Sequence, residues 1–463
     1  MKIEIGNKIV IHEPTEQIVK WCRNNLILDN PDYYKKARMG LWTGNTPETI
    51  QLYERVWQTL ILPFGCLKKI WPMCSGAPYS IEISPFYAKK IKRDISLYPY
   101  QEKAVDEAIK AKNGVIVMPC GAGKTQTALE IIARLGGRTL WLTHTHELLM
   151  QSMRRAKGIF DLPDSEYGTI TEGKVDVRFL TFATVQTMAK IDLSTLKDAF
   201  DVVVVDECHK AIGSPTKVMQ FYKVLSGLSC RYKFGLTATP YRSDHLEKSM
   251  FALLGDVICE ISRDEVSDRT CPVHVKTFRT NYYPTIENVL GTDGVLQYAK
   301  LVEDLTNDKE RFDIVLNTIA KECAGPTIVL ANRVEYLQRL CEEIEKKGKR
   351  CICISGAGTS KKAKKERDEA LRKLEFGELD MVFATYQLAK EGLDVPHLKY
   401  LVMATPEKDK TTVIQSAGRV ARKAEGKDHG EVVDFVDDFG MYRNWAKRRK
   451  KIFENLGFSI DTD

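Results

Sequence analysis

The stretch MPCGAGKT, residues 118–125, follows the apolar run VIV at 115–117 and precedes a stretch with helical periodicity, ALEII at 128–132. A phosphate-binding loop needs backbone N–H groups at a helix N-terminus, glycines that allow close approach, a lysine for the β- and γ-phosphates and a hydroxyl for Mg²⁺. These groups occur here in that order, as Gly121, Ala122, Gly123, Lys124 and Thr125. Met118 stands where the general pattern has its first glycine, so a plain glycine turn with an exposed lysine is the alternative.

A second stretch, VVVVDECHK at 202–210, places Asp206 and Glu207 directly after four valines. Ligands of open α/β sheets bind at the carboxyl ends of the strands, where paired carboxylates can hold Mg²⁺ and orient an attacking water. We therefore predict that Asp206 binds the metal and that Glu207 is the catalytic base. A helix N-cap is the alternative for the pair alone, and the phosphate-loop pattern about eighty residues earlier disfavours it.

Apolar strand patterns alternate with helical patterns twice along the chain. The first series contains GVIVMP, RTLWLTH, VRFLTFA, DVVVVDE and YKFGLTA; the second contains PTIVLAN, RCICISG, LDMVFAT, LKYLVMAT and GEVVDFV. Fully apolar strands that alternate with helices are typical of parallel sheets covered on both faces. The sequence thus predicts an α/β protein with two tandem parallel-sheet domains, over 91–264 and 265–463.

Residues 1–90 predict a small separate α+β domain. KIEIGNKIVI reads as strands, a helix is expected after Pro14-Thr15, and a segment rich in Tyr, Trp and Lys follows. This region carries 12 basic and 8 acidic residues, so it holds much of the net charge of +7. The last residues add the basic run KRRKK at 447–451, which we expect on a C-terminal helix.

Composition excludes several classes of protein. No segment approaches the ~18 apolar residues of a membrane span, so we expect no membrane partner. The twelve cysteines contain no CxxC pair, and Cys351 and Cys353 alternate with isoleucines as strand core residues do. Neither a zinc site nor a disulfide framework is indicated. We expect a reducing compartment, the cytoplasm of the cell or of a host cell, with the nucleus as the alternative.

Ordered motifs over residues 95–440 resemble those of the superfamily 2 helicases and translocases. They are LYPYQ, MPCGAGKT, LTHTHELLMQ, TFATVQTM, DECH with TATP, ATYQLAKEGLDVP and QSAGRVARK, with TIVLANRVEYL like a further motif of the family. The resemblance implies two RecA-like domains that bind ATP and Mg²⁺ in the cleft between them. It implies that hydrolysis opens and closes this cleft.

The resemblance also assigns roles to individual residues. The ATP-site residues it implies are Gln101 for adenine, Gly392 and Asp394 of ATYQLAKEGLDVP, Arg422 as an arginine finger, and Gln415 and Arg419 beside it. Two arginines on an exposed helix face are the alternative for the last motif. The nucleic-acid contacts it implies are Thr143, Thr184 and Gln186.

The finer resemblance is to the XPB, RadD and phage UvsW group of DNA helicases. DECH departs from DEAD, and KARMGLWTG and LILPFGCLKKI resemble segments of the small domain ahead of the UvsW motor. The resemblance implies an ATP-driven remodelling enzyme for branched or forked DNA, including branch migration, fork regression and R-loop unwinding. The sequence leaves the oligomeric state open, and a monomer is favoured. Arg38, Lys68 and Lys69 are candidate phosphate contacts, with a solvated basic surface as the alternative.

Three other functions share these motifs. They are a duplex translocase that separates no strands, an RNA helicase, and a DNA-binding scaffold with an inactive motor, which the intact Lys124, Asp206, Glu207 and Arg422 disfavour. We also expect a chain that begins near Lys92 to fold and to hydrolyse ATP, because the motor motifs begin at Leu97.

Overall fold

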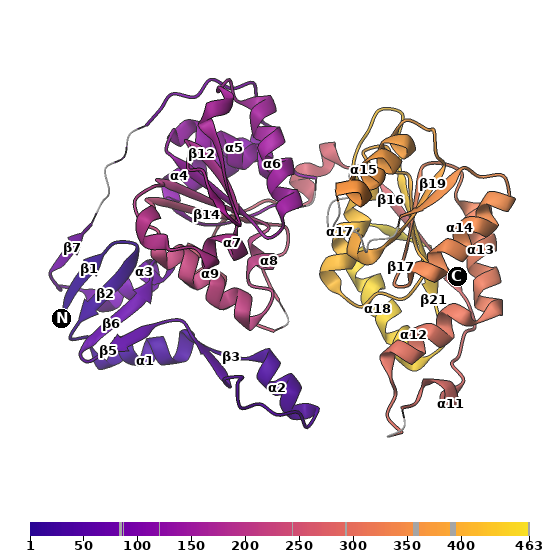
Figure 1. Ribbon diagram of the computed structural model, residues 1–463, viewed down its shortest axis with the longest axis horizontal. Coiled ribbons are helices and arrows are strands. Elements are labelled where there is room, and N and C mark those ends of the chain that lie inside the picture. Colours follow the sequence, from indigo (N-terminus) through magenta and orange to yellow (C-terminus); the bar gives the residue numbers. More distant parts are fainter. Residues whose placement is uncertain are drawn as a thin grey trace. The chain divides into compact units, whose positions relative to one another are not determined.

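The computed structural model consists of two compact units, Met1–Glu265 and Val266–Asp463 (Figure 1). It describes residues 1–82, 86, 88–119, 121–242, 244–291, 294–354, 361–388 and 395–461. The predicted domain limits at 90/91 and 264/265 stay predictions, although the change of unit after Glu265 lies close to the second of them. Each unit is described by itself below.

The first unit begins with a small α+β region. Its elements are β1 Lys2–Ile5, β2 Lys8–His12, α1 Glu16–Asn25, β3 Ile27–Asp29, α2 Pro31–Arg38, β4 Thr49–Gln51, β5 Glu54–Val56, β6 Thr59–Pro63, α3 Leu67–Ile70 and β7 Tyr79–Ile81. Five strands form one sheet in the order β5-β6-β2-β1-β7, and β3 pairs with β4. The expected strands and helix occur, and α1 begins where the Thr15 hydroxyl accepts a hydrogen bond from the Ile18 N–H.

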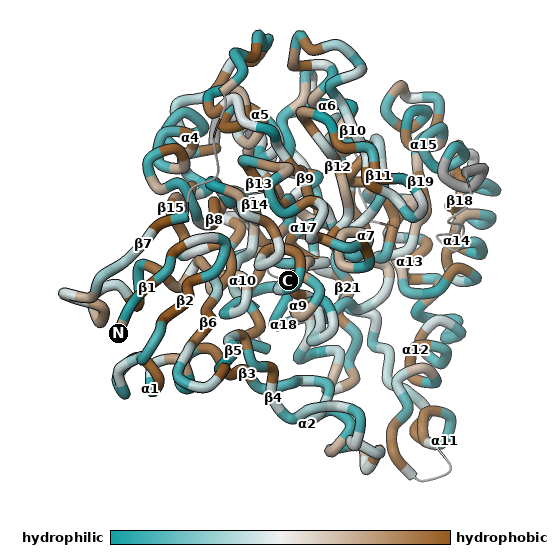
Figure 2. The backbone as a smooth tube through the Cα atoms, turned by 60° about the vertical axis from the view of Figure 1, so that its left-hand side comes forward, coloured by the Kyte–Doolittle hydropathy of each residue, from teal (hydrophilic) through white to brown (hydrophobic). Residues whose placement is uncertain are grey.

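The small region shares one hydrophobic core with the rest of its unit. The tube in Figure 2 is apolar along β6, and residues of β2 and β6 belong to the same buried cluster as Met250 and Leu254. Gly65 follows β6 and packs so closely that an added Cβ would lie 2.5 Å from the Gly255 nitrogen and 2.6 Å from the Ala252 oxygen. The Lys69 ammonium forms an ion pair with Asp256 at 2.6 Å. This packing argues against our expectation that the chain from Lys92 folds without residues 1–91.

The rest of the first unit is an eight-stranded sheet with helices. Its elements are α4 Pro99–Ala111, β8 Asn113–Val117, α5 Lys124–Leu135, β9 Thr139–Thr143, α6 His146–Ile159, β10 Tyr167–Thr171, β11 Lys174–Val175, β12 Leu180–Thr184, α7 Val185–Lys190, β13 Val202–Asp206, α8 Cys208–Ala211, α9 Pro215–Gly227, β14 Tyr232–Thr237, α10 Glu247–Leu254 and β15 Val257–Glu260. The strand order is β11-β10-β12-β9-β13-β14-β8-β15, and only the β10–β11 pair is antiparallel.

This strand order brings the two predicted site segments to one edge of the sheet. Strand β14 lies between β8 and β13 and is parallel to both, so the carboxyl ends of β8 and β13 point the same way. The loop 118–123 follows β8, and Asp206 is the last residue of β13. The valines and isoleucine of β8 and the four valines of β13 are buried, as expected for a sheet covered on both faces.

The second unit is built around a parallel seven-stranded sheet. Its elements are β16 Val273–Arg279, α11 Ile286–Val289, α12 Tyr298–Asn307, α13 Lys309–Glu322, β17 Thr327–Ala331, α14 Val334–Lys346, β18 Cys351–Ile354, α15 Lys361–Glu375, β19 Met381–Thr385, β20 Tyr400–Met403, α17 Lys410–Val420, β21 Gly430–Val436, α18 Gly440–Asn455 and β22 Ser459–Ile460. The strand order is β18-β19-β17-β20-β21-β16-β22, and every pair is parallel. The predicted α/β class with two parallel sheets and a small α+β region is confirmed.

Two buried ion pairs fix the carboxyl end of β21. The Arg311 Nε lies 2.6 Å from Asp437 Oδ1, and a second nitrogen of this guanidinium donates to the Ala404 carbonyl at 3.0 Å. Arg449 of α18 pairs with Asp434 at 3.0 Å and is almost fully buried. One member of the basic run KRRKK is therefore a structural residue, because its charge is neutralised inside the unit.

Candidate functional site

The loop after β8 has the backbone of an anion site. Gly121 has φ +86° and Gly123 has φ +79°, conformations that L side chains rarely adopt. Gly123 is the N-cap of α5, so no side chain caps the first N–H groups of this helix. These donors and the positive end of the helix dipole are available to a bound anion. Cys120 of the loop lies outside the described residues.

Gln101 is fully buried and joins the segment LYPYQ to this loop. Its Nε2 donates to the Ala122 carbonyl at 3.0 Å, while its Oε1 accepts from the Tyr98 N–H at 2.9 Å. A Cβ on Gly123 would collide with the same amide nitrogen. Gln101 thus holds the loop, and its amide is already engaged by the backbone.

The predicted phosphate lysine and the predicted catalytic base lie together. Lys124 Nζ is 3.6 Å from Glu207 Oε1 and donates to the Met118 carbonyl at 3.5 Å. Burial raises the pKa of Asp206 to about 6, and the neighbouring Glu207 carboxylate adds to the rise. Burial acts the same way on Glu207, but Lys124 and then His209 outweigh it, and the pKa of Glu207 falls to about 2. Glu207 is therefore ionised at neutral pH, as a general base must be.

Two histidines near Glu207 were not among the predicted site residues. His209 Nδ1 lies 2.8 Å from Thr237 Oγ1 and 3.3 Å from Glu207 Oε2, which links DECH to TATP. Burial lowers the pKa of His209 to about 4; burial and then Lys210 lower the pKa of His144 to about 3. Both imidazoles are neutral at physiological pH. His144 stands next to Thr143 in the sequence, but no local pattern shows that it faces β13.

The side chains at this site have the chemistry needed to bind a magnesium nucleotide. They are those of Lys124, Thr125, Asp206 and Glu207. Lys124 and Thr125 open α5, and Asp206 ends the parallel strand β13 at the same edge of the sheet. Oε2 of Glu207 is buried without a hydrogen-bond partner among the described residues, and such an acceptor calls for a ligand or water. The helix N-terminus, one lysine, one hydroxyl and paired carboxylates are the groups that hold phosphates and Mg²⁺. The residues present therefore fit ATP with Mg²⁺.

The second unit holds the last predicted ATP-site residues on and just after α17. Gln415 and Arg419 lie on α17, and Arg422 follows its end. The backbone of Arg422 pairs with Thr270, and its carbonyl accepts from Lys427 Nζ at 2.9 Å. Gln415 Oε1 is a buried acceptor with no hydrogen-bond partner within the described part of the chain. Two further residues, Gly392 and Asp394, lie outside the described residues.

The predicted nucleic-acid contacts of the large sheet follow β9 and β12. Thr143 is buried, and its hydroxyl donates to the Thr145 carbonyl at 2.9 Å. Thr184 caps α7 by accepting from the Thr187 N–H at 3.2 Å. Gln186 carries a buried Oε1 that no described residue satisfies. Thr143 and Thr184 thus have structural hydrogen bonds, and Gln186 has an acceptor left for a ligand.

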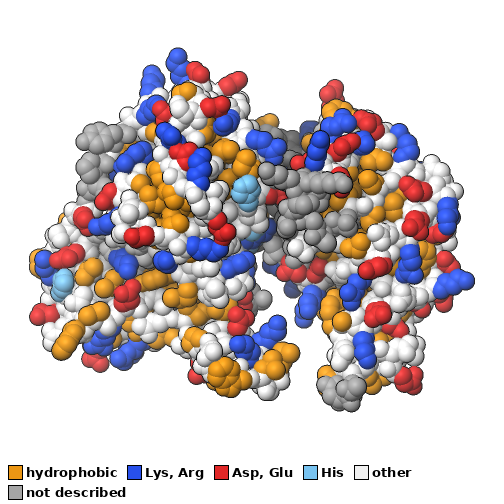
Figure 3. Space-filling view, viewed as in Figure 1, with side chains coloured by type: hydrophobic (Ala, Val, Ile, Leu, Met, Phe, Trp, Pro, Cys, Tyr) orange, Lys and Arg blue, Asp and Glu red, His pale blue; other side chains and the backbone are white. Residues whose placement is uncertain are grey.

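Of the basic residues predicted in the small region, Arg38 and Lys68 are exposed, and Lys69 is exposed but paired with Asp256. Arg38 ends α2, next to a group of exposed apolar side chains, Met39, Leu41 and Trp42. Hydrophobic and basic side chains also lie together near α2 in Figure 3. The ion pair gives Lys69 a role in packing that the sequence did not reveal.

Comparisons with known proteins find similarity to helicases over much of the chain. Residues 94–242 match the family "Type III restriction enzyme, res subunit", and residues 310–424 match "Helicase conserved C-terminal domain". The chain is 26% identical over 382 residues to "Putative ATP-dependent RNA helicase L396" of Acanthamoeba polyphaga mimivirus, covering 79% of this chain and 69% of that protein. It is 26% identical over 369 residues to "DNA 3'-5' translocase XPB2" of Sulfurisphaera tokodaii, covering 72% and 80%.

The crystal structure of T4 UvsW aligns with 100% of this chain, covering 99% of that chain at 19% identity with a TM-score of 0.41. No described helix has both the length and the apolar character needed to cross a membrane. The two matched families, the XPB relatives and the paired parallel sheets together identify the chain as an ATP-hydrolysing helicase of superfamily 2, related to the XPB helicases.

Proposed function

We propose that this helicase remodels branched or forked DNA, in recombination, repair or replication. The observation that carries the proposal is the small region at the N-terminus, which packs through Gly65 on the C-terminal end of α10 and presents exposed apolar and basic side chains around α2. A rigid attachment lets this region resist movement of DNA that the motor drives. Its sequence similarity to the UvsW small domain supports the same proposal.

The surface around α2 suits a junction in nucleic acid. Trp42 is 73% exposed and Met39 is 62% exposed, and with Leu41 they form a group, whereas exposed apolar side chains are usually scattered singly. Lys35 and Arg38 are exposed beside them on α2. Aromatic rings stack on unpaired bases, and the cations bind phosphates without reading sequence. We assign DNA as the partner and keep Arg38 and Lys68 as phosphate contacts.

For the ATP site we propose that Lys124 binds the β- and γ-phosphates and that Thr125 and Asp206 hold Mg²⁺. Glu207 takes the proton of the attacking water, because its ionised carboxylate lies beside Lys124. The loop 121–123 supplies backbone N–H groups, and Gln101 positions that loop and the adenine segment. Arg422 supplies positive charge from the second unit, with Gln415 and Arg419.

The DNA proposal is tested with strand displacement on forked, flap and Holliday-junction substrates. Trp42→Ala and Arg38→Ala should lower the rate on branched substrates and leave ATP hydrolysis without nucleic acid unchanged. Phe376→Ala is the matched control, since Phe376 is a 71% exposed aromatic of the second unit. Equal rates for Trp42→Ala, Arg38→Ala and the control on every substrate would contradict the proposal.

An RNA helicase is the second candidate, because the mimivirus relative is named a putative ATP-dependent RNA helicase. The XPB2 relative, named a DNA translocase, favours DNA. The two candidates differ in one measurement, the stimulation of ATP hydrolysis by DNA and by RNA strands of equal length. We expect greater stimulation by DNA, and greater stimulation by RNA would favour the second candidate.

A further inference from the structure

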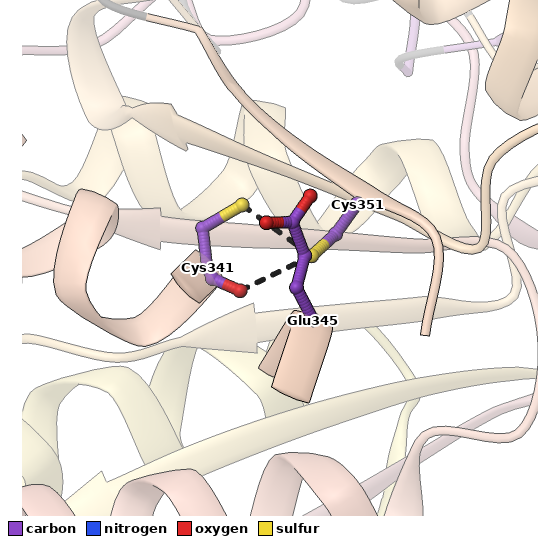
Figure 4. Close-up of side chains that lie close together, drawn as sticks. All are labelled: Cys341, Glu345 and Cys351. Carbon is purple, nitrogen blue, oxygen red and sulfur yellow. Dashed lines mark hydrogen bonds between the residues drawn. The ribbon is translucent and has the colours of Figure 1, made fainter. Parts of the chain in front are cut away.

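Two thiols and a carboxylate converge in the second unit, away from the residues assigned to ATP. Cys341 lies on α14, and Cys351 is the first residue of β18. Their Sγ atoms are 3.4 Å apart, and the Cys351 thiol donates to the Cys341 carbonyl at 3.3 Å. One ligand atom each of Cys341, Glu345 and Cys351 lies within 4.8 Å of the others. Figure 4 shows these three side chains close together, from α14 and the start of β18.

The local fold explains this convergence. Cys341 and Glu345 are four residues apart on α14, so they share one face of the helix. The chain then turns through residues 347–350 and returns as β18, whose first residue is Cys351. Strand β18 is an edge strand of the seven-stranded sheet, and Glu345 is exposed whereas both thiols are buried. An ion can reach the thiols from the solvent side, where the carboxylate lies.

The chemistry of this donor set favours a thiophilic divalent ion. Zinc binds thiolate sulfur at ~2.3 Å and carboxylate oxygen at ~2.0–2.2 Å, with tetrahedral geometry. Two thiolates on one tetrahedral zinc lie about 3.8 Å apart, so the observed sulfur pair needs to open only slightly. A disulfide bond would need the two sulfurs to close to ~2.05 Å. Among the described residues, no basic side chain forms an ion pair with Glu345.

We propose that Cys341, Glu345 and Cys351 bind one zinc-like divalent cation, with water as the fourth ligand. Two metal–sulfur bonds and one metal–oxygen bond to Glu345 replace metal–water bonds of the hydrated ion, one water stays bound as the fourth ligand, and the displaced waters and the two thiol protons pass to solvent. The ion would join α14 to the edge strand β18 and so stabilise the second unit. Mg²⁺ would not compete, because it prefers oxygen ligands.

The test uses the full chain without a histidine tag, reduced and freed of metal with a chelator. Co²⁺ is the probe, since its bonds to thiolates produce charge-transfer absorption in the near ultraviolet. We expect saturation at one Co²⁺ per chain and loss of the absorption when Zn²⁺ is added. Excess Mg²⁺ should leave the absorption unchanged. Zn²⁺ should also raise the midpoint of thermal unfolding.

Variants identify the ligands. Cys341→Ser and Cys351→Ser should abolish the charge-transfer absorption. Glu345→Gln, an exposed change that leaves the core intact, should lower the affinity about tenfold or more, since even changes outside the ligand set commonly have that effect. Cys353→Ser is the matched control, because Cys353 lies on the same strand outside the group. It should bind Co²⁺ as the wild type does.

Three results would overturn the proposal. They are no saturable absorption in the wild type, equal absorption in the Cys341→Ser/Cys351→Ser double variant, and an equal loss in Cys353→Ser and Cys351→Ser. A Cys341–Cys351 disulfide in the untreated chain, with no metal binding after reduction, would overturn it as well. Glu345→Gln keeps the test valid if a serine variant does not fold, because unchanged Co²⁺ affinity in that variant also contradicts the ligand set.

Discussion

Lys124 and Glu207 form an ion pair, with 3.6 Å between Nζ and Oε1, although about eighty residues separate them in the sequence. The pair joins the first residue of α5 to the residue after β13. Lys124 keeps the Glu207 carboxylate ionised in a buried place, since the pKa of Glu207 falls to about 2 against the effect of burial. The ion pair therefore holds both residues at the site before a nucleotide binds. Once it is bound, we expect Lys124 to contact the phosphates and Glu207 to take the proton of the attacking water.

Glu207→Gln should separate ATP binding from hydrolysis. The amide keeps the shape of the side chain and cannot take a proton, so turnover should fall by about 10²–10⁴-fold while ATP affinity changes little. Steady-state hydrolysis and nucleotide titration of the same preparation measure the two effects. A loss of affinity as large as the loss of turnover would show that Glu207 holds the metal or the fold.

Lys124→Ala is the contrasting variant at the same ion pair. It removes the cation that faces the β- and γ-phosphates, so both ATP affinity and hydrolysis should fall, whereas binding of DNA should remain. If this variant hydrolysed ATP at nearly the wild-type rate, the phosphate-loop assignment would be wrong.

Asp206→Asn should stabilise the metal-free protein at neutral pH. The pKa of Asp206 rises to about 6 in the folded state through burial and Glu207, against about 3.9 in an unfolded chain. Above about pH 6 the folded state bears the full cost of the buried charge, and below about pH 4 the carboxyl is protonated in both states and the cost disappears. The gain should therefore be at most about 2–3 kcal/mol near pH 8 and should shrink toward about pH 4.5.

The midpoint of thermal unfolding with a chelator present measures this effect in the wild type and the variant. Hydrolysis of ATP by Asp206→Asn should be lost under every condition, because the metal ligand has changed. A gain in the unfolding midpoint of Asp206→Asn that is equal at about pH 8 and at about pH 4.5 would contradict the explanation by a buried charge.

Arg422→Ala should lower turnover by about 10³-fold or more with little change in ATP affinity, as arginine fingers act on transition-state charge. The backbone pairing with Thr270 holds this position, so the effect should come from the side chain. Arg422→Lys keeps the charge without the planar group and should recover only part of the rate. Wild-type turnover in Arg422→Ala would show that this arginine serves no role in hydrolysis.

Gly65→Ala should loosen the small region from the C-terminal end of α10. The new methyl group would lie 2.5–2.6 Å from backbone atoms of Phe251, Ala252 and Gly255, which side-chain rotation cannot relieve. Overpacking of this kind costs about 1–3 kcal/mol. Gly158→Ala is the control, because it lies in a helix with open space around the added carbon, and it should be neutral or stabilising. Equal unfolding midpoints for Gly65→Ala and Gly158→Ala would contradict the close packing of Gly65 against residues 251–255.

The phosphate loop and the strand before Asp206 were predictable because their signals are local. Buried valines, glycines at positive φ and a helix that begins at Lys124 are all encoded within a few residues. The strands and helices of both parallel sheets follow from the same short-range patterns. These features could therefore be predicted from the sequence.

The remaining features depend on residues that are distant in the sequence. No local pattern places Gly65 against Ala252, Lys69 beside Asp256, or His144 near Glu207. The pair of Cys341 and Cys351 was not predicted, because CxxC spacing does not describe two thiols that a helix-to-strand turn brings together. Independent folding of the chain from Lys92 is the expectation most affected, because no local pattern reveals that residues 1–91 share a core with the large sheet and its helices.

We propose that ATP hydrolysis at Lys124 and Glu207 drives the remodelling of branched DNA. The most direct measurement compares strand displacement on a forked duplex and on an unbranched duplex of the same sequence, with wild-type protein and with Glu207→Gln. We expect the wild type to displace strands only with ATP, and faster on the fork than on the unbranched duplex. We expect no displacement by Glu207→Gln. Equal rates on the two duplexes, or displacement that does not require Glu207, would contradict it.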